Sequence, residues 1–216
     1  MNQQRITFAS GSLKLEGILY LPEGDGPFPC IVVCHPHPLY GGSMDNNVVD
    51  AVCDALVRVS IAAFKFNFRG VGHSQGRYDD GRGEGEDARN SIKYVSTLKE
   101  VDATRIGLCG YSAGAAFSLP ACWSDERIAA IAAISPPLEM FDFSFMADCC
   151  KPLLLVSGSY DDFTPVERFI AFCRELGEAS EQELIVGADH FWCGYEPQLV
   201  ARIASIFSKT LNNKIS

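Results

Sequence analysis

A serine at position 112 has the surroundings that a catalytic nucleophile needs. It lies in Gly110-Tyr111-Ser112-Ala113-Gly114, where a run of strand-forming residues meets a run of helix-forming residues. A sharp strand-to-helix turn strains the backbone of the serine, and small residues two positions away on each side avoid a clash. The turn also directs the first free N–H groups of the helix toward whatever the hydroxyl attacks. Ser112 is therefore predicted to be the nucleophile of an acyl-transfer reaction.

A second match to the same pattern surrounds Ser74, in the sequence Gly-His-Ser-Gln-Gly at residues 72–76. It follows the apolar run 61–68 but precedes a polar, glycine-rich stretch without helical periodicity. Because the strand-turn-helix context is missing, the Ser74 hydroxyl is predicted to be a loop group that satisfies nearby backbone atoms.

The base for the nucleophile is expected to be His190. A serine hydroxyl needs a base at hydrogen-bond distance, and that base needs a third group to fix its tautomer. Among the four histidines, only His190 follows a late predicted strand. Phe191 and Trp192 are expected to shield its imidazole from water. Either Asp161 or Asp162, which follow the preceding strand, can orient the imidazole, and the other can cap the next helix.

These residues lie far apart in the chain, so a sheet must bring them together. Short apolar runs alternate with segments of helical apolar spacing, which is typical of a parallel sheet covered by helices on both faces. Strands are predicted at 5–9 and 13–21, as an antiparallel hairpin at one edge, and at 30–34, 61–68, 105–109, 128–134, 153–156 and 183–186. Helices are predicted at 45–59, 84–98, 113–123, 165–176 and 197–211. Loops after the carboxyl ends of such strands meet in one crevice.

Charged residues outside this crevice are interpreted as structural. Glu84 and Asp87 are expected in the first turn of the helix at 84–98, where the helix dipole favours negative charge. Arg69 is expected to take part in a salt bridge there.

Composition indicates a globular chain in a reducing compartment. Apolar residues make up 47% of the 216 residues, and the net charge of -9 argues against nucleic acid or an acidic membrane surface as a partner. The N-terminus lacks an apolar segment of signal-peptide length, and no apolar run is long enough to cross a bilayer. A cytoplasmic location is expected. No linker or repeat divides the chain, so residues 1–216 are expected to form one domain, as a monomer or a homodimer.

The nine cysteines support the same interpretation. Most fall inside apolar runs, where cysteine behaves as a small hydrophobic residue and not as half of a disulfide. The adjacent pair Cys149 and Cys150 is the one candidate for redox activity, although neighbouring cysteines rarely reach disulfide geometry.

The order Ser112, Asp161, His190 along the chain matches the nucleophile, acid and base of the α/β-hydrolase fold. From about residue 13 onward the chain resembles small α/β-hydrolases related to dienelactone hydrolase, in particular a bacterial group with a His-Pro-His-Pro-x-x-Gly-Gly motif, here residues 35–42. Further matches are Phe-Arg-Gly-Val-Gly at 68–72, the segment around Ser112 and Gly-Ala-Asp-His at 187–190. The resemblance implies an eight-stranded, mostly parallel sheet, and it implies that Asp161 is the acid. Dienelactone hydrolase has a cysteine nucleophile, so its substrate is not carried over.

The oxyanion formed on attack needs two fixed N–H donors. The residue after the nucleophile, Ala113, supplies one. The loop after the third predicted strand, at 30–34, is expected to supply the other, and since Pro36 and Pro38 have no N–H, His37 is the best candidate and Leu39 the next. Only the backbone of His37 is expected to matter, and its side chain is expected to be incidental.

Two alternative functions remain open. His35 and His37 have the spacing of two metal ligands, and a metal-dependent hydrolase could add Asp45 or Asp189 to them. However, the downstream Asp-His of a binuclear site is absent. The other alternative is a non-enzymatic binding protein built on the same fold.

The sequence thus predicts a cofactor-independent and metal-independent serine hydrolase that acts on a small-molecule carboxylic ester or related acyl compound. The segment between the strands at 128–134 and 153–156 is too short for a full lid domain, so an open site is expected. Its aromatic stretch, residues 141–146, can either line an acyl pocket or pack onto the core.

Overall fold

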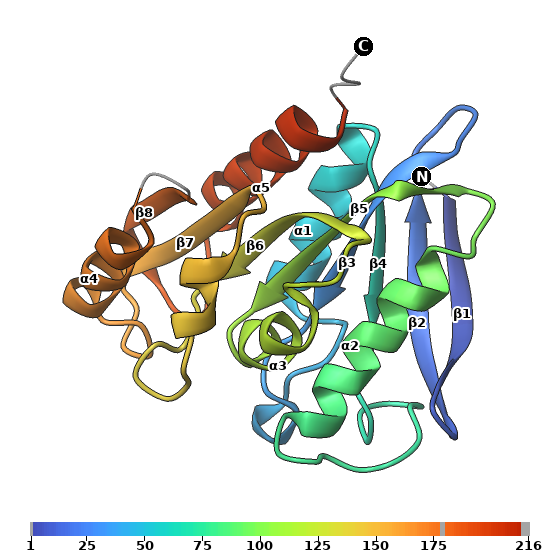
Figure 1. Ribbon diagram of the computed structural model, residues 1–216, viewed down its shortest axis with the longest axis horizontal. Coiled ribbons are helices and arrows are strands. Elements are labelled where there is room, and N and C mark those ends of the chain that lie inside the picture. Colours follow the sequence, from blue (N-terminus) through green and yellow to red (C-terminus); the bar gives the residue numbers. More distant parts are fainter. Residues whose placement is uncertain (1, 178–179, 213–216) are drawn as a thin grey trace.

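Eight strands form one sheet in the order β1-β2-β4-β3-β5-β6-β7-β8 (Figure 1). The computed structural model describes residues 2–177 and 180–212. β1 pairs with β2 and β2 with β4 in antiparallel orientation, and every other pair is parallel. The strands are β1 Asn2–Ser10, β2 Leu13–Leu21, β3 Phe28–Cys34, β4 Ala62–Phe66, β5 Val101–Tyr111, β6 Ile128–Ile134, β7 Leu153–Tyr160 and β8 Ser180–Asp189.

The burial of the strands follows from their sequences. The central strands β3 and β6 are short, mainly apolar runs whose residues are almost all buried, as a sheet covered on both faces requires. β4 is also buried throughout, and its one charged residue, Lys65, forms ion pairs with Asp45 and Asp50. β1 forms the edge of the sheet and alternates between exposed and less exposed residues over much of its length. The predicted antiparallel hairpin at a sheet edge is therefore confirmed.

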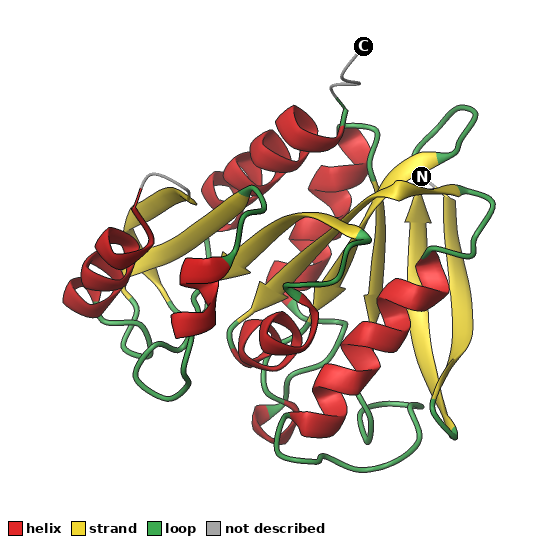
Figure 2. Ribbon diagram, in the orientation of Figure 1, coloured by secondary structure: helices red, strands yellow, loops and turns green. Residues whose placement is uncertain are grey.

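Helices cover both faces of the sheet (Figure 2). α1 and α5 pack on one face, and α2, α3 and α4 pack on the other, each group closing its own hydrophobic core. The predicted layers are therefore confirmed. The helices are α1 Asn47–Arg58, α2 Arg82–Val95, α3 Ala113–Cys122, α4 Val166–Leu176 and α5 Glu196–Leu211, with short 3₁₀ helices η1 Pro38–Tyr40 and η2 Ser144–Asp148.

β4 ends two residues earlier than the predicted strand at 61–68. Its pairing with β3 stops at Phe66, because the next N–H groups find other acceptors. The N–H of Asn67 donates to the carbonyl of Glu16, and the N–H of Phe68 donates to Nε2 of His35. The sequence pattern alone could not show this end, because the apolar Phe68 follows the single polar residue Asn67.

The partly buried Arg69 and the buried Asp87 form an ion pair on the α2 side of the sheet. The carboxylate of Asp87 accepts from Nε and Nη2 of Arg69 at 3.0 and 2.9 Å and from the hydroxyl of Ser10 at 2.6 Å. The predicted salt bridge is confirmed. The first-turn position is right for Glu84, whose carboxylate accepts from the N–H of Gly81, but wrong for Asp87, because α2 begins at Arg82.

All nine cysteines are free thiols, and only Cys150 and Cys193 are exposed. Burial raises the pKa of Cys109 to about 12, so this thiol remains protonated and unreactive near neutral pH. The prediction that most cysteines serve as small hydrophobic residues is confirmed. Cys149 and Cys150 are not joined in a disulfide.

Among the described helices, none has both the length and the apolar character needed to cross a bilayer.

Candidate active site

Ser112 lies at the sharp turn between β5 and α3 and has a positive φ of 53° with ψ -124°, a strained backbone conformation for a residue other than glycine. The two flanking glycines are required by contact. A Cβ at Gly110 would overlap the backbone of Ala115, and a Cβ at Gly114 would overlap the carbonyl oxygens of Cys34 and His35. The small residues that the sequence pattern demanded therefore have the physical role predicted for them.

The structure brings Ser112, His190 and Asp161 together. Nε2 of His190 lies 2.9 Å from Oγ of Ser112, and Nδ1 of His190 lies 2.9 Å from each carboxylate oxygen of Asp161. All three residues are buried. A carboxylate can only accept, so Nδ1 carries the proton and donates to Asp161. The unprotonated Nε2 then faces the serine hydroxyl, as a general base must.

Asp161 is the aspartate that contacts His190, and Asp162 is exposed. Oδ1 of Asp161 also accepts from the N–H groups of Phe163 and Thr164, both at 2.9 Å. The predicted capping of α4 by the other aspartate is wrong, because the N-cap of α4 is Pro165 and no side chain caps it.

Asp161 keeps its negative charge although it is buried. Burial raises the pKa of its carboxyl group, but the interaction with His190 and the hydrogen bonds from Ser135 and the N–H of Phe163 together outweigh that effect. The pKa therefore lies below its ordinary value, and the carboxylate remains available to orient the imidazole.

The imidazole of His190 is flanked by Phe163 and Phe191, with ring centroids 4.5 and 5.7 Å away. Phe191 was predicted to shield this ring, whereas Phe163 was not. The predicted role of Trp192 is wrong, because its side chain is buried in the core of the α1 and α5 face and its Nε1 donates to Oγ of Ser135 at 3.1 Å. Tyr111, beside the serine, donates its hydroxyl to the carbonyl of His190 at 2.7 Å.

Ser74 has the structural role expected of a loop hydroxyl. Its Oγ donates to the carbonyl of Asn67 at 2.7 Å and accepts from the N–H of Glu16 at 3.1 Å. This hydroxyl therefore joins the loop after β4 to strand β2, and the prediction for Ser74 is confirmed.

Two backbone N–H groups are free to bind an oxyanion. Within residues 2–177 and 180–212, the N–H groups of Ala113 and His37 donate to no protein acceptor. The N–H of Leu39, the second choice from the sequence, donates to Nδ1 of His37 at 3.2 Å. That bond leaves His37 as the better candidate of the two.

The side chain of His37 is not incidental. Its Nδ1 accepts from Leu39 and its Nε2 lies 3.2 Å from the hydroxyl of Tyr78, so both ring nitrogens hold the loop in place. The ring also packs against Tyr40, Tyr78 and Phe117. Burial lowers the pKa of His37, which favours the neutral ring that these contacts need.

His35 is fully buried, and both of its ring nitrogens are bonded to the backbone. Nδ1 lies 2.7 Å from the carbonyl of Pro36, and Nε2 accepts from the N–H of Phe68 at 3.1 Å. With these nitrogens occupied, His35 and His37 are not arranged as a pair of metal ligands. No group of three or more His, Cys, Asp or Glu in the described part of the chain could hold a metal ion.

The burial of His35 predicts a pH-dependent stability. Burial lowers the pKa of His35 from 6.5 to about 4 in the folded protein. Between these values the unfolded chain binds a proton that the folded chain does not, so the free energy of unfolding falls as the pH falls. We expect a loss of up to about 3 kcal/mol from pH 7 to 4 from this group.

Urea denaturation at a series of pH values measures this loss. Other carboxylates also titrate in this window, so the slope is compared with that of His35→Gln, which cannot take up the proton. A slope equal in the two proteins would show that His35 does not titrate as its burial implies.

A cavity of about 570 Å³ opens beside Ser112 and His190. Aromatic and apolar side chains line it, among them Tyr40, Met140, Phe141, Phe163 and Phe191. Neither alternative for the aromatic segment 141–146 is right for the whole segment. Phe141 lines the cavity, whereas Phe143 and Met146 are buried in the core.

The fold and the site together are those of an α/β serine hydrolase. The sheet has the strand order of that class and helices on both faces, and the serine, histidine and aspartate lie at the carboxyl ends of parallel strands. The model of the FrsA-like esterases matches residues 1–155. The chain therefore belongs to the FrsA-like esterase family.

One curated relative is similar to this chain over most of its length. The chain is 33% identical over 172 residues to the uncharacterized protein RP471 of Rickettsia prowazekii, covering 76% of this chain and 72% of the relative. It spans only 51% and 46% of the length of two further curated relatives.

Two solved structures share the fold along nearly the whole chain. An α/β serine hydrolase homologue from Coxiella burnetii is 32% identical, with a TM-score of 0.85 and coverage of 95% of this chain and 97% of that one. XC6422 from Xanthomonas campestris, a serine hydrolase without a lid, is 27% identical, with a TM-score of 0.87 and coverage of 99% and 97%. The predicted α/β-hydrolase fold is confirmed.

Proposed function

We propose that this protein hydrolyses a carboxylic ester or a related acyl compound through an acyl-enzyme intermediate. The observation that carries the proposal is the continuous hydrogen-bond chain from Ser112 through His190 to Asp161, all buried at one end of the sheet. Ser112 is the nucleophile, His190 the general base and acid, and Asp161 the residue that orients His190. The N–H groups of Ala113 and His37 form the oxyanion hole.

In the first half of the reaction, Oγ of Ser112 attacks the carbonyl carbon while its proton passes to Nε2 of His190. The electron pair of the carbonyl moves onto oxygen, where the two N–H groups stabilise the charge. When the carbonyl re-forms, the bond to the leaving alcohol breaks and the alcohol takes the proton from His190. In the second half, a water molecule gives its proton to His190 and attacks the acyl-enzyme, and the acid leaves as Ser112 recovers its proton.

The lining of the cavity favours a substrate with an uncharged acyl group. None of the described residues that line it is Asp, Glu, Lys or Arg, so a carboxylate on the acyl chain would lose water without gaining a partner of opposite charge from these four residue types. We further propose that residues 1–216 act as one domain on a small-molecule substrate, without a cofactor. The relation to dienelactone hydrolase, the cytoplasmic location and the choice between monomer and homodimer remain predictions.

A fluorophosphonate probe tests the proposed role of Ser112 directly. Such a probe forms a covalent bond to a serine that an adjacent base activates. We expect the probe to label the wild type and Ser74→Ala at Ser112, and to leave Ser112→Ala unlabelled, as mass spectrometry of the labelled peptide can show. A folded wild type that the probe does not label would favour the non-enzymatic binding protein over the hydrolase.

A further inference from the structure

A second cavity, of about 320 Å³, lies beside the proposed acyl-binding cavity and is not used by the mechanism. Phe141, the apolar residues of one side of α3 and the start of α2 line it, and the exposed residues Asp80 and Arg82 also belong to its lining. Phe141 also lines the larger cavity beside Ser112. It is the one residue that appears in the lining of both among the described parts of the chain, so its ring stands where the two spaces meet.

Helix α3 connects the two cavities. Ala113, its first residue, lines the cavity at the nucleophile, and Ala116, Phe117 and Pro120 line the second cavity. Residues three, four and seven positions apart share one face of a helix. From Ala113 to Pro120 this face runs for about 10 Å, at a rise of roughly 1.5 Å per residue. An acyl chain that extends from Ser112 along this face would meet the ring of Phe141 before it reaches the second cavity.

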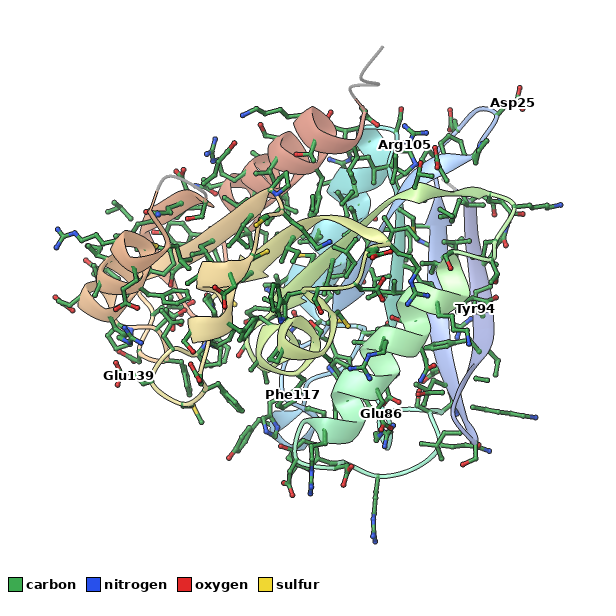
Figure 3. The ribbon with its side chains drawn as sticks, in the orientation of Figure 1. Asp25, Glu86, Tyr94, Arg105, Phe117 and Glu139 are labelled. Atoms are coloured by element: carbon green, nitrogen blue, oxygen red, sulfur yellow. The ribbon has the colours of Figure 1, made fainter. Side chains whose placement is uncertain are left out.

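The position of Phe141 is fixed by its backbone, whereas its ring makes replaceable contacts. Its N–H donates to the carbonyl of Pro137 at 3.1 Å, a bond that any residue except proline would keep. Its ring meets Phe117 edge to face, with centroids 5.8 Å apart. Phe117 in turn extends from α3 toward the start of α2, where a Cβ at Gly81 would touch it (Figure 3). Removing the ring of Phe141 should therefore open a passage between the two cavities without moving the backbone from Pro137 to Phe141.

We propose that the second cavity is an acyl subsite and that Phe141 closes it, so that Phe141 sets the upper limit on acyl-chain length. This inference rests on the proposed function. It identifies the substrates of the wild type as esters of short or medium acyl groups that fit in the first cavity. Phe141 is a specificity-determining residue and takes no part in bond making or breaking.

The test compares the wild type with Phe141→Ala on p-nitrophenyl esters from acetate to decanoate. We expect kcat/KM of the wild type to fall for the longest esters. In the variant we expect the optimum to move to longer chains and kcat/KM for decanoate to rise tenfold or more, because each further buried methylene contributes up to about fourfold. Denaturation curves of the variant and the wild type show whether the variant is folded under the assay conditions.

Two matched variants distinguish the opening of a passage between the two cavities from a general loosening of the first cavity. Met140→Ala removes a side chain that lines only the first cavity, so it opens no passage, and its chain-length optimum should move less than that of Phe141→Ala. Ala121→Leu fills the second cavity and, combined with Phe141→Ala, should restore the preference for shorter chains. If Phe141→Ala does not fold, Phe141→Leu keeps more of the packing and should shift the optimum by a smaller amount.

The outcomes distinguish this proposal from the proposed function. An active wild type with the same chain-length profile as folded Phe141→Ala, or a profile that Ala121→Leu does not reverse, would overturn the subsite alone. A wild type that hydrolyses none of the esters and escapes the fluorophosphonate probe would overturn the proposed function and the subsite with it.

Discussion

Ser112→Ala is expected to lower kcat/KM for p-nitrophenyl butyrate by about 10⁴-fold or more, close to the background left by the rest of the site. The reason is that no other described hydroxyl lies at Nε2 of His190. Without the hydroxyl of Ser112, the acyl-enzyme cannot form and no proton can pass from the nucleophile to His190. Initial rates of p-nitrophenolate release at equal protein concentration measure the loss.

Ser74→Ala is the matched control for this experiment, because Ser74 has the same local sequence pattern but bonds only to backbone atoms. It should keep the activity of the wild type at a temperature where it remains folded. A contaminating esterase is excluded by preparing both variants in parallel. Undiminished turnover by Ser112→Ala in such a preparation would refute the assignment of the nucleophile.

Much of the fold could be predicted because most of the central strands contain a short apolar run bounded by polar or glycine-rich residues. β6 is the clearest case, since Ile128–Ile134 has the bounds that the sequence indicated. The nucleophile could be located because its turn leaves a local signature, the glycines whose missing Cβ atoms would overlap neighbouring backbone. Order along the chain then pointed to a histidine after a late strand.

Contacts between distant loops could not be predicted in the same way. Tyr78 lies 41 residues from His37 in the chain, and no periodicity connects them, yet their contact fixes the loop proposed to hold the oxyanion. The same limit applies to Trp192, whose indole was placed in the site but packs in the core. The sequence shows that an aromatic residue is next to a site residue, but it does not show whether the ring points into the site or into the core.

The choice between Asp161 and Asp162 shows why neighbouring candidates stay ambiguous. Both follow β7, and both are acids of the right length. In the turn after β7 the chain directs only Asp161 inward, where two N–H groups and His190 meet its carboxylate. That direction depends on the turn and on the position of β8, neither of which a local pattern specifies.

Asp161→Asn is expected to lower kcat/KM by about 10⁴-fold while leaving the fold nearly intact. In the wild type the N–H groups of Phe163 and Thr164 donate to Oδ1 of Asp161. The side-chain oxygen of an asparagine can accept the same two hydrogen bonds. Its amide nitrogen then faces Nδ1 of His190 as a donor. The imidazole must accept there, so its proton moves to Nε2, and Nε2 can no longer take the proton of Ser112.

Asp162→Asn tests whether this loss arises from the position of the carboxylate and not from a change of charge in the loop. Asp162 has the same charge, lies one residue further along and is exposed, so this variant should keep nearly full activity. Denaturation curves should show both variants folded under the assay conditions. If the two substitutions reduced kcat/KM equally, the loop as a whole and not the bond between Asp161 and His190 would be responsible, and the role given to Asp161 would be wrong.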